Sequence, residues 1–208
     1  MTHSTSEIHH LIPTTHGQLE LMVSEAMHSE TTAIICHPHS QMGGSMNNKV
    51  VTTTTRAWQN LHYNTIRFNF RGVAASTGVF DHGIGEQEDL ASVIDWAHTH
   101  LPSKQLILGG FSFGAFVALQ FCQTTTPDML LLIAPPTHYA NFHKLHTPLH
   151  SKNFLIVAQA DEVVSSPDIL QWANTQHFQK ILVIPEASHF FHGKLILLRE
   201  WIEQQGTL

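Results

Sequence analysis

Short apolar runs alternate with longer amphipathic stretches along the chain. Residues 31–36 end in four apolar side chains, as in a buried strand, and apolar residues then recur at three- and four-residue steps from Met46 to Leu61, as in a helix. The same alternation predicts strands at 64–70, 105–109, 129–134, 153–158 and 180–184, and helices at 90–101, 115–122, 167–175 and 195–204. Such alternation is typical of an α/β fold, a mostly parallel, twisted sheet with helices on both faces.

Two short strands, at 8–12 and 19–23, come before this alternating region. The turn-like tripeptide Thr15-His16-Gly17 joins them. A connection this short requires antiparallel pairing, so we expect both strands at one edge of the sheet. At 208 residues, with no repeat and no linker, the chain is predicted to be a single domain, 1–208.

The pentapeptide Gly110-Phe111-Ser112-Phe113-Gly114 lies where a predicted strand meets a predicted helix. It reads G-x-S-x-G, and strand, sharp turn and helix are the context in which this pattern forms a nucleophile elbow. The serine of such a turn takes a strained backbone conformation, and the glycines on either side let strand and helix approach closely. The pattern therefore indicates Ser112 as a catalytic nucleophile.

A serine hydroxyl needs a base that takes its proton and an acid that orients the base. On a sheet of this kind the acid and then the base follow the serine, each after a strand. Asp161 and His189 each follow a predicted strand, in that order. Glu162 is expected to point away from the site, and His192 to lie inside the last helix. We therefore predict a triad of Ser112, Asp161 and His189.

The negative oxygen that develops on a reacting carbonyl needs two backbone N–H donors. Phe113 follows the serine and opens the predicted helix, so it supplies one. The second is expected from the loop after strand 31–36. Pro38 has no N–H, which leaves His39 as the prediction and Ser40 as the alternative.

Residues 37–51 read H-P-H-S-Q-M-G-G-S-M-N-N-K-V-V. This stretch resembles the signature H-P-H-P-x-x-G-G-x-M-x-N-K-V-V of small, capless bacterial hydrolases in the α/β-hydrolase superfamily, and departs from it at Ser40. Further likeness covers almost the whole chain, at 67–72, 76–78, 85–89, 160–164 and 188–194. The resemblance implies an α/β-hydrolase fold with no substantial cap domain and the same triad, but no particular substrate.

Residues 135–152 stand where many relatives carry a helical cap. They are rich in His and Pro, so we expect a loop or a single helical turn that leaves the serine in a shallow, open site. Arg71 is expected either to bind an anionic substrate or to hold its own loop through backbone carbonyls. Most of four nearby phenylalanines are expected in the core, with one or two at the pocket favouring a small acyl or aromatic group: Phe111, Phe113, Phe190 and Phe191.

Composition and charge narrow the range of partners. Hydrophobic residues make up 42% of the chain and charged residues 12%, as in a globular protein. The net charge of -6 and the lack of any Lys/Arg cluster argue against nucleic acid or an anionic membrane surface as partner. No apolar run approaches the roughly 18 residues that span a bilayer. We expect a small-molecule substrate.

The start of the chain and its cysteines bear on its location. Residues 1–7 lack the basic and apolar regions of a signal peptide. Cys36 and Cys122 fall at predicted buried positions, which is typical of reduced cysteines. We therefore predict a cytoplasmic protein, and the sequence leaves its oligomeric state open.

The chain holds 18 histidines, which makes a metal site an alternative to consider. His9-His10, His37-Pro38-His39 and His98-Thr99-His100 lack the spacing of a zinc motif such as H-E-x-x-H. The pair His98 and His100 falls at a helix end, where imidazolium suits the negative end of the helix dipole. We expect no metal and no cofactor.

These features together predict a serine hydrolase that cleaves carboxylic esters, or thioesters, through an acyl-enzyme intermediate. Two alternatives stay open: a small serine peptidase or amidase, and a non-catalytic scaffold of the same fold that binds a small ligand. The sequence does not identify the acyl group or the leaving group of the substrate.

Overall fold

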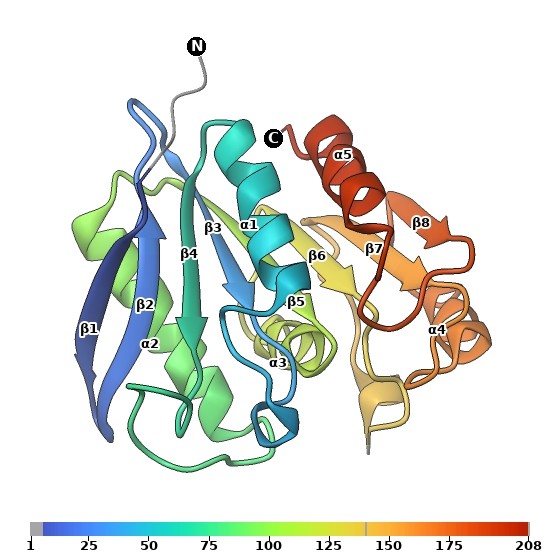
Figure 1. Cartoon of the computed structure of the whole chain (residues 1–208), viewed down its shortest axis with the longest axis horizontal. Helices are drawn as coiled ribbons and strands as arrows, with labels where there is room; N and C mark the ends of the chain where they lie inside the picture. The colour runs from blue at the N-terminus through green and yellow to red at the C-terminus, as the bar shows by residue number, and fades with distance from the viewer. Residues whose placement is uncertain (1–5, 140, 208) are drawn as a thin grey trace.

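One eight-stranded sheet carries the chain in the computed structural model, which describes residues 6–139 and 141–207. The strand order is β1-β2-β4-β3-β5-β6-β7-β8 (Figure 1). This is the predicted α/β-hydrolase fold class. The expected lack of a signal peptide concerns mostly residues 1–5, which lie outside the described residues.

The strands follow the predicted apolar runs with small shifts at their ends. β1 pairs antiparallel with β2 at one edge, as expected, and β2 pairs antiparallel with β4. From β4 to β8 all neighbours are parallel. The bounds are β1 Ile8–Thr14, β2 Gly17–Ser24, β3 Thr31–Cys36, β4 Asn64–Asn69, β5 Gln105–Phe111, β6 Met129–Ile133, β7 Lys152–Ala158 and β8 Lys180–Ile184.

Helices cover both faces of the sheet. α1 and α5 lie on one face, and α2, α3 and α4 lie on the other (Figure 1). The bounds are α1 Lys49–Asn60, α2 Gly85–His100, α3 Phe113–Phe121, α4 Ser166–Ala173 and α5 Leu195–Gln205, with 3-10 turns η1 Ser40–Met42 and η2 Phe142–Lys144. Parallel strands bring their carboxyl ends to one edge of the sheet, so the loops after β3, β5, β7 and β8 meet there.

Two helix starts differ from the prediction by three residues or more, and those of α3 and α4 differ by two and one. α1 begins at Lys49 rather than near Met46, because the Asn48 side chain accepts a hydrogen bond from the Val50 N–H and caps the helix there. α2 begins at Gly85, five residues before the predicted start at Leu90. Apolar spacing does not detect a first turn whose residues face neighbours other than the hydrophobic core.

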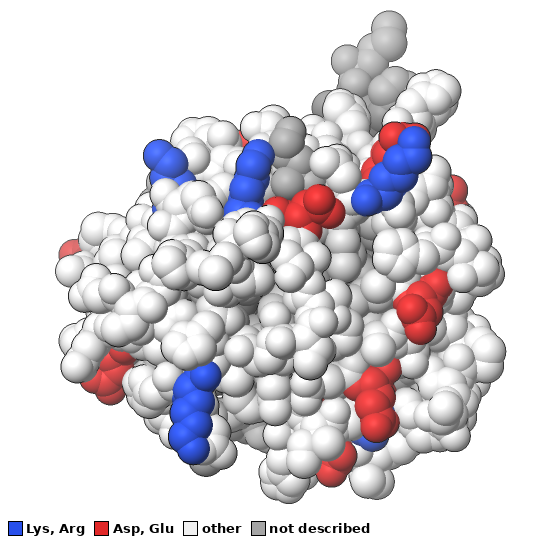
Figure 2. All heavy atoms as spheres, turned by 180° about the vertical axis from the view of Figure 1, so that it is seen from behind, with Lys and Arg blue, Asp and Glu red and all other residues white. Residues whose placement is uncertain are grey.

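Charged side chains are few and scattered on the face that α2, α3 and α4 cover. Figure 2 shows Lys and Arg at separate points there, with Asp and Glu between them. The whole chain carries 10 basic and 16 acidic residues. Charged residues are therefore spread over this face rather than gathered into one patch.

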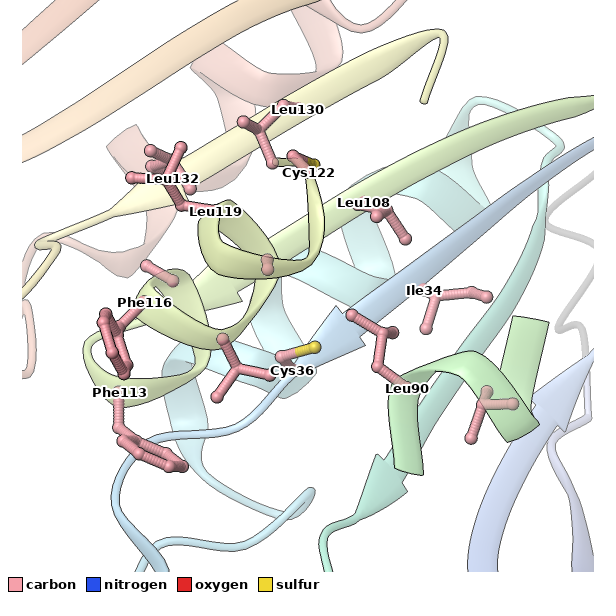
Figure 3. Packing of buried hydrophobic residues seen from close by; sticks show 14 of the residues in the cluster. Ile34, Cys36, Leu90, Leu108, Phe113, Phe116, Leu119, Cys122, Leu130 and Leu132 are labelled. Atoms are coloured by element: carbon pink, nitrogen blue, oxygen red, sulfur yellow. The ribbon is translucent and has the colours of Figure 1, made fainter. Parts of the chain in front are cut away.

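The core is divided by the sheet into two layers. On the α3 side, Phe113, Phe116 and Leu119 pack against strand residues such as Leu108 and Leu132 (Figure 3). Both cysteines are free and buried in this layer, in agreement with the sequence analysis: Cys36 ends β3 and Cys122 ends α3. On the other side, α1 and α5 cover the sheet through residues that include Trp58 and Ile202.

Candidate active site

Ser112 occupies the tight turn between β5 and α3. Its backbone has φ 53° and ψ -120°, a strained conformation for a residue with a side chain. A Cβ on Gly110 would collide with the backbone of Gly114, and one on Gly114 would lie 2.6 Å from the His37 carbonyl oxygen and also meet the Cys36 carbonyl. The expectation that both glycines permit close approach is confirmed.

The three residues of the predicted triad lie in hydrogen-bond contact. His189 Nε2 is 3.0 Å from Ser112 Oγ, and His189 Nδ1 is 2.7 Å from Asp161 Oδ2. The second Asp161 oxygen accepts the N–H groups of Val163 and Val164, both at 2.8 Å. A carboxylate accepts hydrogen bonds, so this arrangement suits Nδ1–H donating to Asp161, with Nε2 left to accept from the serine hydroxyl.

Two neighbours of the triad differ from the prediction. Glu162 does not point away, because its Oε2 accepts the backbone N–H of His189 at 3.1 Å. His192 is not in the final helix, which starts at Leu195; it lies in the preceding loop, with Nδ1 3.5 Å from Ser188 Oγ. Neighbouring side chains were expected to point in opposite directions. In the turn after β7, however, the carboxylates of Asp161 and Glu162 both contact His189 in the loop after β8.

The loop after β3 carries His39, the residue that was predicted as the second oxyanion donor. Among the described residues, neither the His39 nor the Phe113 N–H has a hydrogen-bond acceptor. His39 lines the same pocket as Ser112, whereas Ser40 begins η1. A Cβ on Gly44 would meet the carbonyl oxygens of Pro38 and His39, so this glycine keeps the loop closely folded.

The His37 side chain holds this loop in place through hydrogen bonds, a role that the sequence did not indicate. Its ring is fully buried, with Nδ1 2.6 Å from the Pro38 carbonyl oxygen and Nε2 accepting the Phe70 N–H at 3.0 Å. A ring that accepts at Nε2 must donate from Nδ1, so it is neutral. Burial lowers the pKa of His37 from 6.5 to about 4. The H-P-H motif was the signal available, but the partner, Phe70, directly follows β4 and lies 33 residues away in the sequence.

A pocket of about 360 Å³ opens above Ser112. Ser112 is 9% exposed and His189 3%, so the serine lies at the base of a pocket rather than in the shallow, open site that was expected. The β6–β7 connection holds the short turn η2, as predicted, but three of its residues, Pro136, His138 and Tyr139, also line the pocket.

Of the four phenylalanines considered, one lines the pocket. Phe190 does so and is 39% exposed, whereas the other three are buried, as expected for the majority: Phe111, Phe113 and Phe191.

Arg71 follows neither of its two expected roles. Its backbone N–H and its guanidinium both bind Asp89, with Nε and Nη2 at 3.0 and 2.8 Å from Oδ1, and Nη2 also reaches Glu88 at 3.1 Å. These carboxylates raise the pKa of Arg71 against the opposing effect of its burial. Arg71 therefore ties its loop to α2 through carboxylates rather than backbone carbonyls, and its charge is already matched.

The histidine-rich motifs have local partners. His98 and His100 lie in the last turn of α2, as predicted, and His100 Nδ1 is 2.9 Å from the Trp96 carbonyl oxygen. Within residues 6–139 and 141–207, no group of three or more His, Cys, Asp or Glu side chains is placed to hold a metal ion. In the same part of the chain, no helix has the length and apolar character needed to cross a bilayer.

A largely parallel sheet with a serine on a strained strand–helix turn, in contact with a histidine and an aspartate from later loops, defines the class of α/β-hydrolase-fold proteins. A model of the alpha/beta hydrolase fold family matches residues 41–155, more than half of the chain, and the chain belongs to this family.

Relatives span most of the chain. The uncharacterized protein RP471 of Rickettsia prowazekii (strain Madrid E) is 37% identical over 175 residues, 78% of this chain and 72% of the relative. An alpha-beta serine hydrolase homologue from Coxiella burnetii has a TM-score of 0.91 and 39% identity, covering 99% of this chain and 100% of its own. XC6422 from Xanthomonas campestris, described as an a/b serine hydrolase without lid, has a TM-score of 0.89 and 40% identity, covering 97% and 94%.

Proposed function

We propose that this protein is a serine hydrolase that cleaves carboxylic esters through Ser112, His189 and Asp161. The observation that carries the proposal is the continuous path from Ser112 Oγ to His189 Nε2, at 3.0 Å, and from His189 Nδ1 to Asp161, at 2.7 Å. Hydrolase activity is also supported by the two solved relatives near 40% identity, which are described as serine hydrolases or their homologues.

The geometry suits an acyl transfer in two steps. In the first, Ser112 Oγ bonds to the ester carbonyl carbon while its proton passes to His189 Nε2, which then protonates the departing alcohol as the C–O bond breaks. In the second, water attacks the acyl-enzyme, gives a proton to His189, and Ser112 leaves with that proton. Asp161 holds the imidazole in position and stabilises its charged form.

The negative oxygen of each tetrahedral intermediate is assigned to the Phe113 and His39 N–H groups. The Phe113 N–H stands at the first turn of α3, where the helix dipole adds a favourable field. Donors without a protein acceptor remain available to a developing oxyanion. Esters come before amides as substrates because an alkoxide leaving group needs less help from the protonated histidine than an amine does.

The test is hydrolysis of p-nitrophenyl butyrate together with labelling by a fluorophosphonate probe. Ser112→Ala is expected to lower kcat by roughly 10⁴- to 10⁶-fold and to abolish labelling. Ser92→Ala is the matched control, since the Ser92 hydroxyl donates to a carbonyl within α2, and it is expected to keep both signals. Hydrolysis that survives Ser112→Ala unchanged would contradict the proposal, and a wild-type serine inert to the probe would favour a non-catalytic scaffold.

A further inference from the structure

The loops of the predicted acid and base each add an apolar side chain to the pocket. Val163 lies two residues after Asp161 and is 47% exposed, and Phe190 directly follows His189 and is 39% exposed. Apolar surface gains free energy when a ligand removes it from water. The His189 side of the pocket is therefore suited to an apolar group.

The Phe190 ring is held in a defined orientation. Its centroid lies 5.2 Å from that of His189 and 5.9 Å from that of Phe111, at interplanar angles of 84° and 72°. Both are edge-to-face contacts, an arrangement that aromatic pairs prefer. The exposed part of this fixed ring offers a further aromatic contact at little entropic cost.

The reaction places one half of an ester beside this ring. His189 Nε2 must reach the oxygen of the departing alcohol to protonate it, whereas the carbonyl oxygen faces the Phe113 and His39 N–H groups. The alcohol half therefore lies closest to His189, and so to Phe190.

The pocket offers no permanently charged partner, since its ionisable lining side chains, apart from Tyr139 and Ser112, are the histidines His39, His138 and His189. The described residues that line it include no Lys, Arg, Asp or Glu. Desolvation lowers the pKa of His39, the ring on the oxyanion loop, which favours its neutral form. The guanidinium of Arg71 is bound to Asp89. An anionic substrate would lose its hydration without gaining a counter-ion.

Building on the serine-hydrolase function above, we infer that the pocket selects uncharged esters of aromatic alcohols, and that Phe190 is the residue that recognises the aromatic ring. The ring of the alcohol packs against Phe190 while the acyl group is transferred to Ser112.

The first test compares benzyl acetate with cyclohexylmethyl acetate, measured by acid release. The two esters share one acyl group and have alcohols of similar acidity, so they differ chiefly in the ring. Phe190→Leu is expected to lower the ratio of kcat/KM, benzyl over cyclohexylmethyl, by about 2- to 10-fold, the range that one aromatic pair contributes. Phe190→Tyr keeps the ring and is expected to keep the ratio.

Three further substrates show which half of the ester carries the preference and whether charge is excluded. Methyl benzoate and methyl cyclohexanecarboxylate carry the same pair of rings in the acyl half, and their ratio is expected to be the same in wild type and Phe190→Leu. An anionic analogue, 4-carboxybenzyl acetate, is expected to have a kcat/KM about tenfold or more below that of benzyl acetate. The inference is overturned if Phe190→Leu leaves the benzyl ratio unchanged, if it shifts the acyl pair instead, or if the anion is hydrolysed as well as benzyl acetate.

Binding to the Ser112→Ala chain separates this inference from the proposed function. Titration by NMR is expected to show tighter binding of benzyl acetate than of cyclohexylmethyl acetate, with the preference lost when Phe190→Leu is added. If wild type hydrolyses neither these esters nor p-nitrophenyl butyrate, the proposed function fails, and the binding preference still decides the inference. Equal binding of both esters overturns the inference even where hydrolysis is observed.

Discussion

Replacing His37 with Asn should change how the stability of the protein depends on pH. The fully buried ring accepts the Phe70 N–H and is neutral, with its pKa lowered by burial to about 4. In the unfolded chain the same ring titrates near 6.5. Between these pH values the unfolded state binds a proton that the folded state does not. The contribution of His37 to the free energy of unfolding is therefore fully present above pH 6.5 and is lost as the pH falls toward 4.

The size of this effect follows from the two pKa values. With a pKa of about 4 in place of 6.5, His37 lowers the free energy of unfolding by about 3 kcal/mol once the pH is below 4. Between pH 7 and pH 4.5 the loss of unfolding free energy is about 2.5 kcal/mol. Asn at position 37 does not titrate, while its amide N–H can still donate to the Pro38 carbonyl. The variant is expected to lose about 1–3 kcal/mol at pH 7, since the Phe70 N–H is left without an acceptor, and to depend less on pH.

Urea unfolding followed by tryptophan fluorescence at pH 7 and pH 4.5 measures both quantities. Between these pH values the free energy of unfolding of wild type should fall by about 2.5 kcal/mol more than that of His37→Asn. Val93→Ala, which only creates a cavity in the core, should lower stability at both pH values and keep the wild-type difference. Equal losses of unfolding free energy in wild type and His37→Asn between the two pH values would rule out a lowered pKa of His37. Glu7 and Glu20, whose pKa values are also lowered, are common to all three proteins.

Three further substitutions test contacts around the site. Gly114→Ala places a Cβ against backbone carbonyls at the end of β3. Urea unfolding should therefore show a loss of about 1–3 kcal/mol in the free energy of unfolding, and an ester assay should show a lower kcat. Unchanged values would contradict the close approach. Arg71→Met leaves the buried Asp89 carboxylate without its cation and should cost about 3–5 kcal/mol by the same assay, partly recovered when Asp89→Leu is added. Glu162→Ala removes the acceptor of the His189 backbone N–H and should lower kcat by about 2- to 10-fold. Glu162→Gln still has an acceptor oxygen and should keep most of the activity. Equal losses in the two variants would exclude a positioning role for this hydrogen bond.

Much of the fold could be predicted because its signals are local. A buried parallel strand is mostly apolar, so Thr31–Cys36 was predicted with the bounds it has. The apolar run of Lys180–Ile184 was also predicted with its observed bounds, although this edge strand is only partly buried. The start of α1 was wrong by three residues, because the apolar spacing extends to Met46 while the Asn48 side chain caps the helix after it. Helix ends depend on such single hydrogen bonds, which periodicity does not report.

The supporting contacts of the site could not be predicted, because each joins distant parts of the chain. Arg71 was expected to bind substrate or backbone carbonyls, and instead binds Asp89, which only the packing of α2 beside the β4 loop brings within reach. His37 accepts the Phe70 N–H at its Nε2, a contact between residues 33 positions apart in the sequence.

Apolar periodicity in the sequence was enough to predict the order of strands and helices along the chain. Because parallel strands end at one edge of a sheet, the same pattern also indicated Ser112, Asp161 and His189 as candidates for the site. Tertiary structure decided the rest: that the three side chains meet at hydrogen-bond distances, and that Phe190 rather than its buried neighbours faces the pocket. The physical reason is that a distance between loops depends on how the whole sheet twists and packs, and no stretch of sequence near either residue encodes it.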